Sequence, residues 1–386
     1  MEKVKIALLT LCFNKDNNEA MNITSALLAK ALSKKGHEVF IFSHRNIKEL
    51  KFEKLGGVNI VRYWPRLSLN LHHKLFFLDP FMLVNHIFAQ IEGLKYAKKK
   101  LNKDFEIIIN TASSPLISLR SFFAKKLFPN AKVIMLIKSI SLFKSFNFYS
   151  LLNVNDFLIT PSINIRKILL RNNVKKPIKI INSPINTEKF IPLNKQELKK
   201  KYNYKNKKIL LYYGHFNKFK GVEFLIKSLN YIKTKEILLL LIPSKNNDKN
   251  LYNELIKKEK LKDKIKVLDS NINIVDFVNM ADVAIFPYPS LVSTEANPSC
   301  VLECLACKIP VITSDLPQLR EILIHKHTAL LAKLKNPRDI ARNIDLVLNS
   351  TILRTKLIKN GFMISKKFSI KNISENYLKL FEKRGK

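Results

Sequence analysis

Residues 282–315 read DVAIFPYPSLVSTEANPSCVLECLACKIPVITSD. A short apolar run, DVAIFPY, precedes an Asn-Pro pair, a helical pattern and a second apolar run, PVITSD. Asn is favoured as an N-cap and Pro as the first helical residue, so Asn297 and Pro298 predict a helix that runs to about Lys308. Strand, helix and strand in this order predict a βαβ unit of a parallel sheet.

The same alternation continues on both sides of this unit. Before it, the apolar runs KILLYYGHF, EILLLLIP and IKVLD alternate with amphipathic stretches, and an earlier series contains KIALLTL, HEVFIFS, EIIINTA and AKVIML. The two series are separated by a polar, lysine-rich stretch, INTEKFIPLNKQELKKKYNYKNKK, which we interpret as a linker. The sequence therefore predicts an α/β protein with two parallel-sheet domains, which bind ligands at the carboxyl ends of their strands.

Composition limits the class of protein and its partners. With 386 residues, of which 47% are hydrophobic, the chain can bury the cores of two domains. It carries 68 Lys and Arg against 30 Asp and Glu, a net charge of +38. Such a charge attracts nucleic acid, anionic membranes or phosphorylated substrates, although a merely solvated lysine surface explains it equally well. The lysines are scattered and form no nucleic-acid-binding motif, so no nucleic-acid partner is expected.

The cysteines indicate a reducing compartment. There are four, Cys12, Cys300, Cys304 and Cys307, too few for a disulfide scaffold in a chain of this length. The last three have helical spacing and lack a second cluster of ligands, which favours small buried side chains over a metal site. No apolar run reaches the length of a membrane span, and we expect a cytoplasmic protein without a bound metal.

Two acids in the opening stretch suggest a ligand. The predicted helix would direct backbone N–H groups of its first turn, near Asn297, Pro298, Ser299 and Cys300, towards a diphosphate. Glu295 lies just before this turn, and Glu303 lies about two turns further on, where a carboxylate can accept hydrogen bonds from two sugar hydroxyls. This arrangement predicts a nucleotide-sugar site.

At this point the sequence resembles the retaining GT-B glycosyltransferases of group 1. That family has an E-x7-E motif followed by A-x-G-x-P-V, and this chain has Glu295, Glu303 and then ACKIPV, with Lys308 in place of the usual glycine. Four further segments are similar to family motifs: YYGHFNKFKGVEFLIKSL, ADVAIFPYPS, NSPINTEKFIP and GHEVFIFS. The resemblance implies a GT-B fold of two Rossmann-like domains facing across a cleft. Its expected parts are an acceptor domain at 1–190, a nucleotide-sugar domain at 191–360 and a C-terminal helix at 361–386 that packs towards the N-terminal domain.

The resemblance also assigns roles to residues. Lys220 would neutralise the leaving diphosphate, Glu295 would orient the donor sugar, and Glu303 would bind the ribose. His215, after the strand glycine Gly214, replaces the usual arginine, and Asn17 and Asn18 replace the usual paired glycines. The N-terminal-domain histidine of many relatives has no match, since Asn110 and Thr111 stand in that region.

The implied activity is transfer of a sugar from a nucleoside diphosphate, with retention of configuration and without cofactor or metal. The expected acceptor is a glycan or a lipid-linked molecule. Residues 66–101 and 138–152 combine apolar and basic side chains, which fits either ordinary buried helices or peripheral attachment to an anionic membrane surface. Three alternatives remain open: an epimerase or phosphorylase with the same fold, an inactive relative, and a basic nucleic-acid-binding protein.

Overall fold

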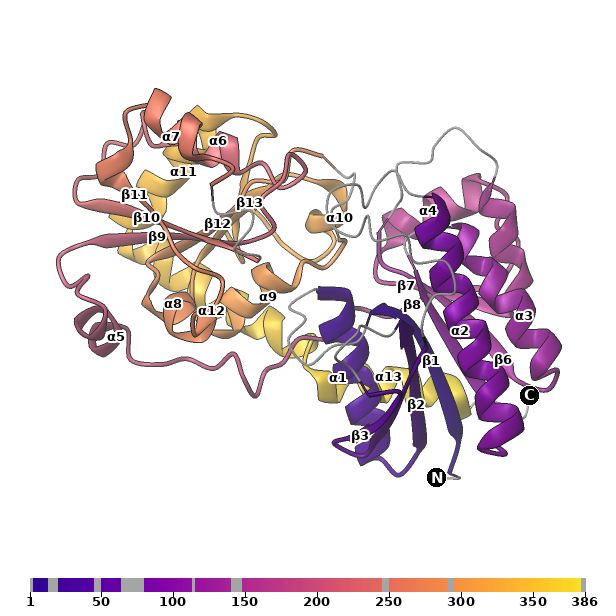
Figure 1. Cartoon of the computed structure of the whole chain (residues 1–386). Helices are drawn as coiled ribbons and strands as arrows, with labels where there is room; N and C mark the ends of the chain where they lie inside the picture. The colour runs from indigo at the N-terminus through magenta and orange to yellow at the C-terminus, as the bar shows by residue number, and fades with distance from the viewer. Residues whose placement is uncertain are drawn as a thin grey trace. The chain divides into compact units, whose positions relative to one another are not determined.

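The computed structural model describes residues 3–12, 20–44, 50–63, 80–112, 115–139, 148–244, 250–290 and 295–382. The chain forms two compact units, Met1–Pro184 together with Ile373–Lys386, and Ile185–Asn372 (Figure 1). The change from one unit to the other therefore falls at residue 184 rather than at 190. The C-terminal segment from 361 is divided between the units, because the second one continues to Asn372.

The first unit contains an eight-stranded sheet in the order β3-β4-β2-β1-β5-β6-β7-β8. Its pairs are parallel except for β3 with β4, a hairpin whose turn has Gly56 and Gly57 at positive φ and which the sequence analysis does not foresee. The chain runs from β1 outwards to β2 and β4, and from β5 outwards in the other direction, so the topology reverses between β1 and β5. The strands are β1 Lys5–Cys12, β2 Glu38–His44, β3 Phe52–Leu55, β4 Val58–Tyr63, β5 Ile107–Ala112, β6 Lys132–Ile137, β7 Phe157–Thr160 and β8 Ile178–Ile180.

Helices cover both faces of this sheet. Successive side chains of a strand point to opposite faces, so Ile6 and Leu8 enter one core and Ala7 and Leu9 the other, which is why β1 is apolar throughout. The helices are α1 Ala20–Lys34, α2 Pro80–Lys100, α3 Leu119–Leu127, α4 Ile163–Arg171 and α13 Ile370–Glu382, with 3-10 turns at Pro115–Ser118 and Phe148–Val154.

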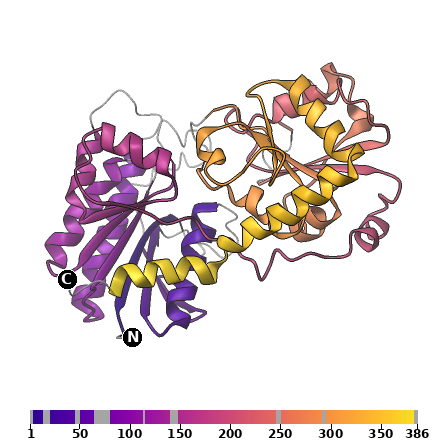
Figure 2. The ribbon, with the colours of Figure 1, turned by 180° about the vertical axis from the view of Figure 1, so that it is seen from behind.

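The last helix, α13, belongs to this first unit from Ile373 onwards. Figure 2 shows it in yellow against the N-terminal sheet. Its apolar residues share a core with α1 and with the strands β1, β2, β5 and β6; they are Ile373, Tyr377, Leu378 and Phe381.

The second unit contains a six-stranded, fully parallel sheet in the order β11-β10-β9-β12-β13-β14. Its topology reverses between β9 and β12. The strands are β9 Lys208–Gly214, β10 Ile237–Pro243, β11 Ile265–Val267, β12 Val283–Phe286, β13 Val311–Ser314 and β14 Leu330–Ala332. The helices are α5 Lys195–Lys201, α6 Val222–Ser228, α7 Asn253–Lys258, α8 Ile274–Met280, α9 Ser299–Ala306, α10 Pro317–Arg320, α11 Pro337–Asn349 and α12 Thr351–Lys367, with a 3-10 turn at Lys262–Lys264.

The expected linker is part of this second unit. Ile185 and Phe190 are buried in its core, and Asn194 caps α5 by accepting hydrogen bonds from two backbone N–H groups. Lys199 of α5 is buried and donates to Asp282 at 2.6 Å. The lysine-rich stretch that was expected to be a linker is therefore the solvated surface of helix α5 and not a flexible connection.

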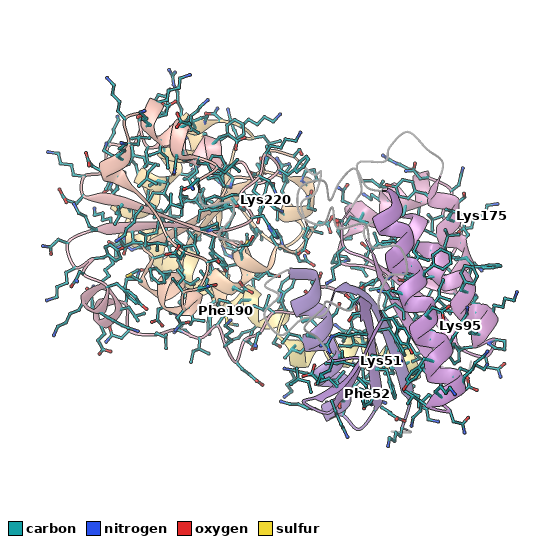
Figure 3. All side chains as sticks on the ribbon, in the orientation of Figure 1. Lys51, Phe52, Lys95, Lys175, Phe190 and Lys220 are labelled. Carbon is teal, nitrogen blue, oxygen red and sulfur yellow. The ribbon has the colours of Figure 1, made fainter. Side chains whose placement is uncertain are left out.

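Many of the described lysines are exposed to solvent; Lys95 and Lys175 of the first unit, labelled in Figure 3, are two of them. Within the described ranges, no helix is both long and apolar enough to cross a bilayer.

Candidate functional site

The candidate site lies at the carboxyl ends of β9 and β12, where the topology of the second sheet reverses. In parallel α/β sheets this is the position at which ligands bind. Strand β9 ends at Gly214, whose φ of 137° favours glycine. The Tyr212 hydroxyl donates to the carbonyl of His215 at 2.8 Å and so fixes the backbone just after the strand.

Lys220 and Gly221 directly precede α6, with Gly221 as its N-cap, and they pack on the segment that follows β12. Gly221 has a φ of 71°, and a Cβ atom there would lie 2.0 Å from the carbonyl oxygen of Pro287, so only glycine fits. The ammonium of Lys220 (Figure 3) lies 5.5 Å from the ring centroid of Tyr288, whose hydroxyl is 3.2 Å from Cys300 Sγ. Through Tyr288, these contacts place Lys220 near the first turn of α9.

Helix α9 begins where a helix was expected, but its cap differs. Pro298, with φ −63° and ψ 121°, is the N-cap, and Ser299 is the first helical residue. The prediction that Asn297 caps the helix is therefore wrong by one position, because the φ that proline imposes also suits a cap with extended ψ. Asn297 is buried. The helix ends at Ala306, earlier than the predicted Lys308, which has a φ of 59°.

Glu303 is the most perturbed acid of the site. It is only 9% exposed, and the Tyr213 hydroxyl donates to its Oε2 at 2.7 Å. Burial raises the pKa of Glu303 to about 7; the bond from Tyr213 and the charge of Lys189 oppose this rise, and the charge of Glu295 adds to it. The carboxyl group thus changes its protonation near neutral pH.

Tyr213 was not among the predicted site residues. Its hydroxyl also lies 3.1 Å from the carbonyl oxygen of Cys300, so it joins the end of β9 to both turns of α9. Burial raises its pKa well above the usual value, and the hydroxyl stays protonated as a donor. The only sequence signal is its place directly before the strand glycine.

His215 and Glu295 lie at the edges of this group. His215 Nδ1 is 2.7 Å from the hydroxyl of Ser244, a second residue that the sequence analysis missed. Glu295 is partly buried, and its charge contributes to the raised pKa values of Glu303 and Tyr288, so it lies near both.

The remaining predicted residues divide into two groups. Asn17 and Asn18 lie outside the described residues, as do much of 66–101 and most of 138–152. In the first unit, Asn110 donates to Ile117 O and Ser121 Oγ, and Thr111 donates to Leu9 O, so both stabilise local structure at the end of β5.

Cys300 and Cys304 of α9 and Cys307, its C-cap, are small packed side chains, as predicted. Cys304 and Cys307 are buried in the core of the second unit, and burial raises the pKa of the partly buried Cys300 to about 12. Among the residues that the structure describes, no cluster of His, Cys, Asp or Glu has the arrangement of a metal site.

A known protein family matches the part of the chain that contains this site. The sequence profile described as "Glycosyl transferases group 1" matches residues 194–363, which include α5, Lys220 and both glutamates. Residues 194–363 belong to the group 1 glycosyltransferases. Over the longer span of 378 residues, the chain is 26% identical to N,N'-diacetylbacillosaminyl-diphospho-undecaprenol alpha-1,3-N-acetylgalactosaminyltransferase of Campylobacter jejuni, covering 92% of this chain and 94% of that protein.

Solved structures place the whole chain of this glycosyltransferase in one fold. Sucrose-phosphate synthase from Thermosynechococcus elongatus superposes with a TM-score of 0.81 at 19% identity, covering 98% of both chains. HepE of Anabaena, solved in complex with UDP-glucose, superposes with a TM-score of 0.77 at 12% identity, covering 98% of this chain and 99% of that one. The fold is GT-B, with two Rossmann-like parallel-sheet domains, as the sequence analysis predicted.

Proposed function

We propose that this glycosyltransferase moves a sugar from a nucleoside-diphosphate sugar to a lipid-linked acceptor, with retention of anomeric configuration. The observation that carries the proposal is the convergence of Lys220, the first turn of α9 and the buried Glu303 at the switch point of the second sheet. A cation and free N–H groups suit a diphosphate, and a buried carboxylate suits the hydroxyls of a ribose.

The roles follow from charge. As the bond to the sugar breaks, negative charge develops on the diphosphate, and Lys220 together with the N–H groups of Ser299 and Cys300 would stabilise it. Ionised Glu303 would accept hydrogen bonds from the ribose, and Glu295 would orient the donor sugar. The backbone at Gly214 and the ring of His215 would border the diphosphate. Because these groups would supply the electrostatic stabilisation, we propose a reaction that needs neither a metal nor another cofactor.

The proposed acceptor rests on two observations. The Campylobacter jejuni relative is named for a diphospho-undecaprenol substrate, and it is similar over nearly the whole chain. The net charge of +38 also favours approach to an anionic membrane surface. We therefore propose a cytoplasmic enzyme that attaches peripherally to the membrane and acts on a glycan linked to a lipid diphosphate.

A donor and acceptor screen tests the activity. UDP-, GDP- and ADP-sugars are first ranked by the rise in melting temperature that each causes, and the best are then incubated with short polyprenyl-diphosphate sugars. We expect a glycosylated lipid whose new linkage, read by NMR, keeps the anomeric configuration of the donor. A free, epimerised nucleotide sugar would instead indicate an epimerase, and an inverted linkage would contradict the proposed stereochemistry.

Two additional measurements test the finer parts of the proposal. Activity should persist in EDTA; loss that Mg²⁺ or Mn²⁺ restores would contradict a metal-free reaction. Flotation with vesicles should show binding that requires anionic lipid and weakens towards about 0.5 M salt, where exposed charges are screened. Failure to bind anionic vesicles at low salt would contradict membrane attachment.

A further inference from the structure

Helix α3 of the first unit presents large apolar side chains to solvent. Leu119, Phe122 and Phe123 have the spacing i, i+3 and i+4, which places them on one face of the helix. Their exposed fractions are 43%, 54% and 36%, and the rings of Phe122 and Phe123 contact each other edge to face, with centroids 5.6 Å apart. Contiguous exposed apolar groups mark interaction sites on soluble proteins, so this stripe indicates a surface that binds something.

Helix α4 exposes apolar and basic side chains together. Ile163 and Leu170 are exposed, as are Arg166, Lys167 and Arg171. These residues follow one another at steps of three and four along the helix, so they share one side of it. The outer side of α4 therefore combines two aliphatic chains with three positive charges.

The charge on the two helices has one sign. Helix α3 adds the exposed Lys126, one turn beyond Phe122 and Phe123, and neither α3 nor α4 contains an acidic residue. The neighbouring Lys125 is ion-paired with Asp156 and adds no net charge. Exposed apolar side chains flanked by unopposed basic ones are typical of a surface that lies in the interface of an anionic membrane.

Both helices, labelled in Figure 1, cover the same side of the first sheet. The connections β5-α3-β6 and β7-α4-β8 each join parallel neighbours in the same direction along the sheet, and such crossovers are right-handed, so their helices lie on one face. The 3-10 turn at Phe148–Val154 contacts α3, and its Asn153 donates to the carbonyl of Asn173, just beyond α4, at 3.0 Å. The surface, here named the α3–α4 face, consists of Leu119, Phe122, Phe123, Lys126, Ile163, Arg166, Lys167, Leu170 and Arg171.

The face reaches the edge of the sheet at which ligands are expected. Leu119 and Ile163 are the first residues of α3 and α4, which follow the carboxyl ends of β5 and β7. Open α/β sheets bind ligands at this edge. A membrane on the α3–α4 face would therefore lie beside the edge to which a lipid-linked acceptor has to come.

We propose that the first unit attaches to an anionic lipid surface through the α3–α4 face. Phe122 and Phe123 would enter the boundary of the acyl chains, and the basic residues of α4 would contact the headgroup phosphates. This inference rests on the proposed peripheral attachment and assigns it to particular residues. The segments 66–101 and 138–152, which the sequence analysis considered for this role, contribute no residue to the face.

A charge-neutralised variant tests the contact with headgroups. Each basic residue near an anionic surface strengthens binding by about 5-fold, so Arg166→Gln/Lys167→Gln should bind vesicles of phosphatidylglycerol and phosphatidylcholine about 10- to 30-fold more weakly at low salt. The matched control is Lys257→Gln/Lys258→Gln, which removes two adjacent exposed charges from α7 of the second unit. It should weaken binding by less than about 3-fold, because only the net charge changes.

Two variants of Phe122 test the insertion of apolar side chains. Phe122→Ser should weaken vesicle binding by about 5- to 10-fold, whereas Leu251→Ser, at a similarly exposed position of the second unit, should not. Phe122→Trp keeps an apolar ring and supplies a local probe. Its added fluorescence should be quenched by lipids brominated in their acyl chains, and that of Leu251→Trp should not, each measured above the signal of the natural Trp64.

The outcomes decide the proposal as follows. Selective weakening in the α3 and α4 variants, with quenching of Phe122→Trp, supports it. Vesicle binding equal to that of the wild type, or an unquenched Phe122→Trp, overturns it by assigning attachment to another face. A wild-type dimer that dissociates in Phe122→Ser would assign the face to a second copy of the chain and overturn it as well.

Transfer to a short-chain polyprenyl-diphosphate sugar in detergent is measured separately for the wild type and each variant. Absence of transfer in the wild type would contradict the proposed function whatever the vesicles show. Transfer that persists in the variants while their vesicle binding falls would show that the α3–α4 face acts in attachment and not in the chemistry.

Discussion

Replacing Tyr213 by Phe should move the pH at which the donor binds. In the wild type, donor affinity should rise with pH through about 7, because binding the ribose needs the ionised carboxylate and burial raises the pKa of Glu303 to that value. The Tyr213 hydroxyl donates to this carboxylate at 2.7 Å and stabilises its ionised form. Tyr213→Phe removes only this oxygen, so the pKa of Glu303 should rise further.

The size of the effect follows from the hydrogen bond. A bond to a charged group contributes about 1.5 to 3 kcal/mol, and 1.36 kcal/mol corresponds to one pH unit, so the midpoint should move up by roughly one to two pH units. At pH 7 the ionised fraction would fall from about one half to between about a tenth and a hundredth. Donor affinity at pH 7 should therefore weaken by roughly 5- to 50-fold.

The assay is calorimetric titration with the intact nucleotide sugar between pH 5.5 and 9. The intact donor is used because free UDP has a phosphate that titrates in this range. Glu303→Gln serves as the reference without a titrating carboxylate, and any pH dependence that remains in it belongs to groups other than Glu303. Tyr202→Phe is the matched control: its hydroxyl also binds a carboxylate, Asp276 at 2.8 Å, away from the donor site.

Two results would refute this reasoning. A midpoint in Tyr213→Phe equal to that of the wild type would mean that the hydroxyl does not control the ionisation of Glu303. Weakening by the same factor at every pH would indicate a loss of structure instead. If Glu303→Gln bound the donor as well as the wild type at pH 8, the assignment of Glu303 itself would be wrong.

Three further predictions concern the same unit. Lys220→Met should lower kcat/KM by about 100-fold, whereas Lys227→Met, which removes an exposed charge from the neighbouring helix, should leave it unchanged; equal rates would remove Lys220 from the site. Gly221→Ala should lower the melting temperature well beyond Gly36→Ala, because both glycines have positive φ but only the first meets a carbonyl oxygen at 2.0 Å. In urea titrations, the unfolding free energy of the wild type should fall relative to Glu303→Gln as pH rises from 4.5 to about 7, since the native state retains a proton that the unfolded state releases; a constant difference would contradict the raised pKa.

The sequence predicted the parts of the molecule that depend on local patterns. Apolar runs bounded by turn residues identify the parallel strands. Lys220-Gly221 and the two glutamates belong to short motifs that can be recognised in the sequence without knowledge of tertiary contacts. The N-cap of α9 was misplaced by one residue because neighbouring Asn and Pro both favour helix starts, and local preferences cannot rank them.

Features that depend on contacts between distant parts of the chain could not be predicted from the sequence. Tyr213 and Glu303 are 90 positions apart, and only the adjacency of β9 and β12 brings them together. Likewise, nothing in the run of lysines around 199–201 marks Lys199 as the buried one, because its burial depends on Asp282, which lies far along the chain between α8 and β12.

The position of α13 has a consequence for how the chain acquires its structure during synthesis. Ile373, Tyr377 and Phe381 fill the core beneath the N-terminal sheet, although more than 180 residues of another unit separate them from it. Until α13 has been synthesised, the first unit has an open hydrophobic surface. The second unit is continuous from Ile185 to Asn372, so all of its residues are synthesised before the first unit has received its last helix. The part of the chain made first is therefore the part completed last, and a premature stop anywhere before residue 373 leaves it with an uncovered core.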